Sequence, residues 1–146
     1  MLLAVDTSNE QLGLAIYDGT QTIGERAWMS SQHHTVELAP AIQGLLTRCG
    51  LTMDNIRALG IALGPGSFTS LRVGLALAKG LAYSRGIPLI GIPTLDILAH
   101  AQPVTELPLA VAIQAGRGRY ALGWYKSVQG RWQAEGPARV VSVEAI

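Results

Sequence analysis

The chain has 146 residues, 49% of them hydrophobic, a formal net charge of +1 and a single cysteine, Cys49. This length suits one domain with a substantial core, while the small charge gives no reason to expect strong binding to nucleic acid or membranes, and a lone cysteine excludes an internal disulfide and a thiolate metal cluster. No basic segment precedes the first apolar run and no apolar run reaches 18 residues, so the sequence predicts no signal peptide, no transmembrane helix and a cytoplasmic location.

The first part of the chain alternates short apolar runs with longer amphipathic segments. A meander of three antiparallel strands comes first, with Asp18-Gly19 as the hairpin signal between the second and the third. Buried strands and helices then alternate, which predicts a mixed α/β sheet covered by helices. The expected order is β-β-β-α-β-α-β-α, with strands over 2–5, 12–17 and 22–28, a helix over 35–48, a strand over 58–63, a helix ending at Arg85, a strand over 88–92 and a helix beginning at Thr94.

A glycine-rich loop, Gly64-Pro65-Gly66-Ser67, joins the strand over 58–63 to the next helix. Ser67, Thr69 and Ser70 are the candidate N-caps, because their hydroxyls can accept from the first-turn N–H groups. A glycine loop before a helix can bind an anion. This loop, however, has neither the Lys-Ser/Thr ending of a P-loop nor G-x-G-x-x-G spacing, so as a generic phosphate signal it is weak.

The helix after this loop carries small residues at intervals of four along one face. Its two interior glycines, Gly74 and Gly80, each cost roughly 1 kcal/mol relative to alanine, and close approach of another backbone can offset that cost. Two interpretations are open: the helix packs on its own sheet, or it forms an interface with another chain. For the second interpretation the predicted interface comprises Leu71, Gly74, Leu75, Ala78, Leu81 and Ala82.

The end of the chain repeats the pattern of its beginning. Residues 112–125 align without a gap to residues 4–17, with matching apolar positions. The alignment places Gln114 on Asp6, and it predicts a second meander with a third strand over 140–143.

The repeat divides the chain into a first lobe over 1–105 and the beginning of a second, similar lobe over 106–146. No helix remains to cover the second sheet, and a half-covered sheet is a poor place to end. We therefore expect the chain to be truncated, cleaved or missing its last segment.

Several motifs together resemble the TsaB family of the actin-like ATPase superfamily, whose lobes are ribonuclease H-like. They are the string from Gly64 to Gly74, with Gly64, Pro65, Gly66, Ser67 and Arg72 as the loop signature, and the segments Asp6-Thr7-Ser8, Glu37-Leu38-Ala39-Pro40 and Gly91-Ile92-Pro93-Thr94-Leu95-Asp96. The sequence departs from the family at Thr35, where Ser is usual, and at Ser70, where Gly is usual. The resemblance covers nearly all of residues 1–125 and implies a duplicated β-β-β-α-β-α-β-α lobe.

The resemblance also implies a function. In that family TsaB is a non-catalytic scaffold for making N6-threonylcarbamoyladenosine on tRNA, paired with its metal-bearing catalytic paralogue TsaD and joined by the small ATPase TsaE. The paired surface uses the first-lobe helices, where the stripe of small residues lies. We expect a homodimer when TsaD is absent, contact with tRNA only through the complex, and no membrane partner.

The histidines predict no metal site. The resemblance implies that TsaD holds its metal with a His-x-x-x-His pair on one helical face. Here His33 and His34 are adjacent, so their side chains diverge in any regular element, and His100 is alone. We predict no metal-binding residues.

The sequence also lacks the residues that nucleotide hydrolysis and acyl transfer require. An actin-like ATPase needs acidic residues from both lobes, but Gln114 stands opposite Asp6, which leaves Asp6 as a turn-capping residue. No His or Asp follows Ser67 or Ser70 at a recognisable spacing. We therefore predict no catalytic residue and no cofactor, and a free-standing actin-like ATPase or metallopeptidase-type enzyme is the less favoured alternative.

The second meander groups basic and aromatic residues that offer an RNA-facing edge. They are Arg117, Arg119, Tyr120, Trp124, Lys126, Arg131 and Trp132. A solvated hairpin is the simpler interpretation, and we favour it.

Overall fold

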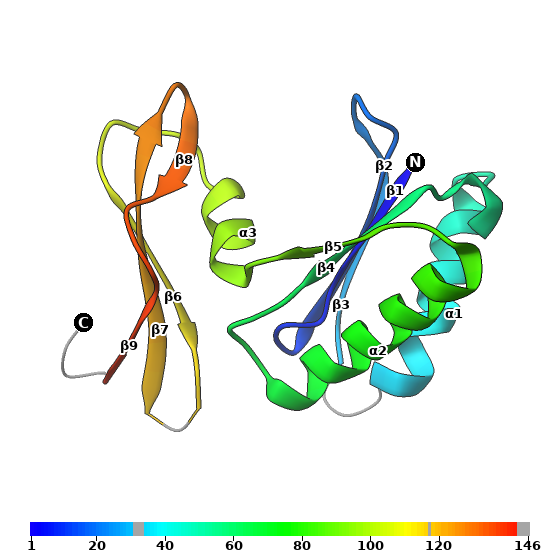
Figure 1. Ribbon diagram of the computed structural model, residues 1–146, viewed down its shortest axis with the longest axis horizontal. Coiled ribbons are helices and arrows are strands. Elements are labelled where there is room, and N and C mark those ends of the chain that lie inside the picture. The colour runs from blue at the N-terminus through cyan, green and yellow to red at the C-terminus, as the bar shows by residue number, and fades with distance from the viewer. Residues whose placement is uncertain (31–33, 117, 143–146) are drawn as a thin grey trace.

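The computed structural model describes residues 1–30, 34–116 and 118–142, which form two β-sheets and the helices packed on them (Figure 1). Helices α1 and α2 lie together on one side of the first sheet, and α3 stands between the two sheets. The expected order β-β-β-α-β-α-β-α followed by a further set of strands is the observed one, which confirms the predicted fold class. No helix among these residues is long and apolar enough to cross a membrane.

The first sheet has the strand order β3-β2-β1-β4-β5. Its strands are β1 (Leu2–Asp6), β2 (Gln11–Tyr17), β3 (Thr22–Met29), β4 (Ala58–Ala62) and β5 (Leu89–Ile92). The first three pair antiparallel as the predicted meander, and β4 and β5 add in parallel. At the β2–β3 turn the Asp18 carboxylate accepts from the N–H groups of Thr20 and Gln21 at 2.7 and 2.8 Å. These bonds lower the pKa of Asp18 and stabilise the hairpin that the sequence predicts.

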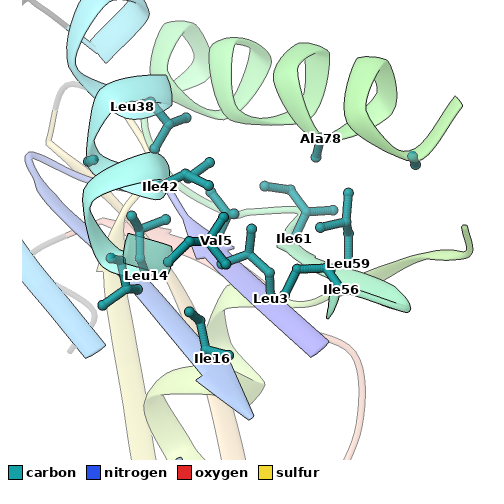
Figure 2. Close-up of a cluster of buried hydrophobic side chains, with 14 residues drawn as sticks. Leu3, Val5, Leu14, Ile16, Leu38, Ile42, Ile56, Leu59, Ile61 and Ala78 are labelled. Carbon is teal, nitrogen blue, oxygen red and sulfur yellow. The ribbon is translucent and has the colours of Figure 1, made fainter. Parts of the chain in front are cut away.

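The main core lies between this sheet and helices α1 (His34–Arg48) and α2 (Phe68–Arg85). Alternate residues of β1 and β2 face the helices, as the two-residue period of a strand requires. Figure 2 shows these side chains converging beneath the two helices, and they include Leu3, Val5, Leu14, Ile16, Leu38, Ile42, Ile56, Leu59, Ile61 and Ala78. Each fully buried Leu or Ile contributes about 1.5–3 kcal/mol, so this core supplies most of the apolar burial of the first lobe.

A short 3₁₀ helix, η1 (Met53–Asn55), links α1 to β4. Thr52 and Asn55 form a reciprocal capping box at its ends. Its Asp54 forms an ion pair with Arg85 at the end of α2, so the connection is tied to the last turn of that helix.

Helix α2 comes unusually close to the turn after β1. A Cβ atom at Gly74 would overlap the Thr7 side chain, at Oγ1 and Cγ2. The Thr7 hydroxyl is fully buried and donates to the backbone oxygen of Ser70, one turn earlier, at 2.8 Å. The absence of a side chain at position 74 is thus what lets the helix and the turn meet.

The small-residue stripe faces this sheet and not a free surface. Gly74, Ala78 and Ala82 are all buried within the chain, and Ala78 and Ala82 belong to the main core. Of the two interpretations of the stripe, packing on its own sheet is the one that the structure shows. The prediction of an interface centred on these three residues is therefore wrong, because they are buried within the chain and a second backbone cannot reach them. The flanking leucines, Leu71, Leu75 and Leu81, are half-buried.

The second sheet has the order β6-β7-β8, with β9 pairing the other half of β7. Its strands are β6 (Leu109–Gln114), β7 (Arg119–Val128), β8 (Arg131–Ala134) and β9 (Arg139–Ser142). Helix α3 (Thr94–His100) covers one face, where its Leu95 and Ala99 pack with Val111, Tyr125 and Trp132. The predicted boundary at residue 105 stays a prediction, but these contacts join α3 to the second sheet.

The two meanders differ by one residue in register. In the first meander Leu2 pairs with Tyr17. In the second meander Tyr125, which the gap-free alignment matches to Tyr17, pairs with Leu109. Leu109 is one position before the residue that the alignment matches to Leu2. A shift of one residue turns a strand's side chains to the opposite face. Tyr17 is accordingly 40% exposed, while Tyr125 is 3% exposed and part of the second core.

The close approach at Gly74 predicts opposite effects for two matched substitutions. Gly74→Ala should lower the free energy of unfolding by about 1–3 kcal/mol, because the new methyl overlaps Thr7. Gly80→Ala, on the same helix with nothing within 4 Å of the added Cβ, should raise it by about 0.5–1 kcal/mol through helix propensity. Urea unfolding followed by circular dichroism measures both, and a stabilising Gly74→Ala would contradict the proposed contact.

Candidate functional site

The signature loop is held from two sides. The Gly64–Pro65 peptide is cis, and the N–H of Ser67 donates to the backbone oxygen of Ser8 at 2.6 Å. A Cβ at Gly66 would overlap that same oxygen, so glycine is required for the loop to lie against the β1–β2 turn. Gly64 is bonded in both directions to Thr94 at the start of α3. The loop signature therefore reflects close backbone packing.

Two serine hydroxyls interact with each other at the start of α2. Ser67 is the N-cap residue, one of the three candidates, but its side chain makes no capping bond to the helix backbone. Instead the Ser70 hydroxyl donates to the Ser67 hydroxyl at 2.9 Å. Ser70, which stands where the family usually has glycine, is buried beside the turn after β1.

A cavity of about 840 Å³ separates this region from the second sheet. One wall comes from Ser8 to Gln11 and from the start of α2 at Gly66, Ser67 and Phe68, and the other from the turn at Ile113 to Gly116. Among the lining residues that the structure describes, Glu10 alone carries a charge.

Asp6 and Gln114 take different positions around this cavity. Gln114 lines it, whereas the Asp6 carboxylate accepts from the N–H of Ser8 at 2.8 Å. Asp6 thus has the turn-capping role expected of it. Among its described lining residues the cavity presents amides, hydroxyls and the single carboxylate of Glu10, not the paired carboxylates that would hold Mg²⁺.

A second hollow, of about 600 Å³, is lined by residues of α2 and by Leu38 of α1. We call it the α1–α2 groove, and its lining residues are Leu38, Phe68, Thr69, Arg72, Val73, Ala76 and Leu77. The Phe68 ring is 73% exposed, and the Arg72 guanidinium lies 5.2 Å from the centre of that ring. A stacked aromatic–arginine pair is energetically favourable and remains accessible here.

The outward face of α2 is apolar and basic. It carries the exposed residues Arg72 and Lys79, and Tyr83 near its end is 93% exposed. Helix α2 has no acidic residue between 68 and 85. Sequence reasoning missed this face. The sequence does contain a signal for it, a second row at helical spacing that comprises Thr69, Val73, Ala76, Gly80 and Tyr83.

The candidate metal ligands that the structure describes do not come together in one site. The Nδ1 of His100 donates to the backbone oxygen of Asp96 at 2.8 Å, while His33 and the side chain of His34 lie outside the described residues. Within residues 1–30, 34–116 and 118–142, no group of three or more His, Cys, Asp or Glu side chains could hold a metal ion.

The basic and aromatic residues of the second meander differ in exposure, so they do not all contribute to one surface. Trp132 is buried, and its indole N–H donates to the backbone oxygen of Gln102 at 3.2 Å, so it belongs to the core under α3. Trp124 is 49% exposed, and Arg119, Lys126 and Arg131 are exposed. Arg117 lies outside the described residues. An RNA-facing edge stays a prediction, with fewer stacking groups than the sequence offered.

The sequence and the fold are both similar to known proteins. The model of the family described as "TsaD: tRNA N6-adenosine threonylcarbamoyltransferase" matches residues 28–146. A Bacillus subtilis tRNA threonylcarbamoyladenosine biosynthesis protein TsaB is 33% identical over 129 residues, 88% of this chain and 56% of the relative. The Escherichia coli TsaB is 31% identical over 150 residues, 99% of this chain and 64% of the relative.

Among solved structures, YeaZ from Pseudomonas aeruginosa is similar with a TM-score of 0.87 and 27% identity, over 97% of this chain and 67% of that one. The chain thus spans 56% and 64% of the length of the two curated relatives above. The loop signature, the strand order of the first sheet and these similarities agree, and the chain belongs to the TsaB family, within the wider family described by TsaD.

Proposed function

We propose that this chain is a non-catalytic partner subunit in the formation of N6-threonylcarbamoyladenosine on tRNA, and that it binds a TsaD-type paralogue. The curated relatives are named as biosynthesis proteins for that modification. The observation that carries the proposal is the α1–α2 groove with its exposed Phe68–Arg72 pair. Aromatic and arginine side chains dominate binding energy in protein interfaces.

The proposed interface is the outward row of α2 and not the buried stripe of small residues on the same helix. Thr69, Val73 and Ala76 line the groove, and Gly80 and Tyr83 continue the row to the end of α2. Small residues along this row let a second helix approach closely. The same face would pair two copies when the paralogue is absent, because a two-fold interface needs one patch able to meet itself. Leu71, Leu75 and Leu81 would then border the core and not the partner.

The non-catalytic part of the proposal rests on the cavity. Its walls supply the hydroxyl of Ser67 and the amide of Gln114, with Asp6 engaged in a turn. The proposal further includes TsaE as a third component, contact with tRNA only through the complex, and a cytoplasmic location, where tRNA modification takes place. A free-standing ATPase or metallopeptidase would need paired carboxylates or several metal ligands, whereas among the described residues of these walls Glu10 supplies a single carboxylate.

Two arginine substitutions on neighbouring faces of α2 test the proposed interface. Ala76→Arg places a charge on the exposed row, so it should leave the free energy of unfolding within about 0.5 kcal/mol and raise the Kd for the TsaD paralogue at least about tenfold. Ala78→Arg buries an unpaired charge where the side chain is 2% exposed, and should cost more than about 3 kcal/mol.

Urea unfolding followed by circular dichroism gives the free energy of unfolding, and titration calorimetry with the paralogue gives the Kd. Sedimentation of each variant alone reports the homodimer. A folded Ala76→Arg variant that binds the paralogue like the unchanged chain would place the interface elsewhere.

The purified chain is expected to hydrolyse no ATP above background and to carry no stoichiometric zinc or iron. The reason is the neutral Gln114 opposite Asp6 and the lack of a spaced histidine pair. Phosphate release measures the ATP hydrolysis, and elemental analysis measures the bound zinc and iron. About one metal per chain, lost on changing His33 or His34 to alanine, would refute this expectation.

Binding of tRNA by the chain alone should be weak and nearly independent of sequence. A net charge of +1 leaves few phosphate contacts, so few counterions are released and the salt dependence should be shallow. Filter binding across a salt series checks this, and tight binding at physiological salt would contradict contact only through the complex.

A further inference from the structure

Helix α3 follows the first sheet in sequence but packs with the second. Its Leu95 and Ala99 share a core with Val111, Tyr125 and Trp132. The Tyr125 hydroxyl donates to the Asp96 carboxylate at 2.7 Å. This bond is partly buried, which raises the pKa of Tyr125 through desolvation and the neighbouring carboxylate. The helix is therefore fixed to β7 by both packing and a charge-assisted hydrogen bond.

The first residue of α3 is fixed just as firmly to the signature loop of the first lobe. Thr94 is fully buried, and its Oγ1 accepts from the N–H of Gly64 at 3.1 Å. In return the N–H of Thr94 donates to the Gly64 oxygen at 2.9 Å. A residue pair that exchanges two hydrogen bonds resists sliding and tilting, so the start of α3 and the loop must move together.

The loop in turn fixes one wall of the large cavity. The Ser67 N–H bonds to Ser8 at 2.6 Å, and Phe68, the next residue, lines both the cavity and the α1–α2 groove. The opposite wall is the turn after β6, which belongs to the second sheet. A continuous series of contacts thus joins the two walls through Gly64, Thr94, Asp96 and Tyr125.

We propose that α3 is a lever that moves with the second sheet and couples the opening of the cavity to the start of α2. Because coupling is reciprocal, occupation of the groove at Phe68 would shift the second sheet, and a change at Tyr125 would be felt in the signature loop. This coupling goes beyond the proposed function and does not depend on which partner binds.

Hydrogen exchange on the purified chain tests the lever. Tyr125→Phe removes one hydroxyl and keeps the ring, and it should speed exchange in the peptide covering Gly64–Ser67 about fivefold, the equivalent of one net hydrogen bond. Tyr17→Phe is the matched control, because it removes an exposed tyrosine hydroxyl bond to Gly19, and it should leave that peptide unchanged. An unchanged loop in Tyr125→Phe would overturn the proposal.

The route is tested by combining Tyr125→Phe with Thr94→Val, which keeps the shape of the side chain and removes the acceptor. In the Thr94→Val background the effect of Tyr125→Phe on the loop should be smaller, because one of the two Thr94–Gly64 hydrogen bonds is lost. An undiminished effect there would show that the coupling does not depend on the contact between α3 and the loop and would overturn the lever.

Should Thr94→Val fail to fold, spin labels at the exposed positions Thr20 and Gln133, in a Cys49→Ala background, decide instead. The distance distribution between the two lobes should broaden in Tyr125→Phe and not in Tyr17→Phe. Identical distributions in the two variants would overturn the proposal.

Discussion

The close approach of α2 to the turn after β1 is the contact on which the rest of the first lobe depends. Thr7 reaches the backbone of α2 because position 74 has no side chain, and the loop reaches Ser8 because position 66 has none. These two absences cost helix propensity and chain entropy. The core formed by β1, β4 and α2 offsets that cost, and it holds the signature loop in one place.

The same contact determines what α2 can offer to another molecule. Once the small residues face the sheet, the opposite row, from Thr69 to Tyr83, must face outward, and the exposed Phe68–Arg72 pair lies beside it. Inward packing and the proposed outward interface therefore belong to one helix, separated by its 3.6-residue period. A substitution on the buried row is expected to act on folding, and a substitution one or two residues away on the proposed association.

The second sheet shows how similar sequences can give different environments. Its first hairpin resembles that of the first sheet residue by residue, yet a one-residue difference in pairing turns Tyr125 inward while Tyr17 stays exposed. The buried tyrosine then meets Asp96 of α3, a contact with no counterpart at Tyr17. The helix that separates the sheets in Figure 1 is thereby joined to the second of them.

The sequence by itself determined the order of strands and helices, the Asp18 hairpin, the turn-capping role of Asp6 and the family, because these follow from local periodicity, turn chemistry and a distinctive loop string. Only the tertiary structure decided which way α2 faces, since a stripe of small residues suits a sheet and a partner helix equally well. It also decided the placement of α3 and the register of the second hairpin. Those depend on contacts between residues far apart in the chain, such as Thr94 with Gly64 and Tyr125 with Asp96, which no local pattern records.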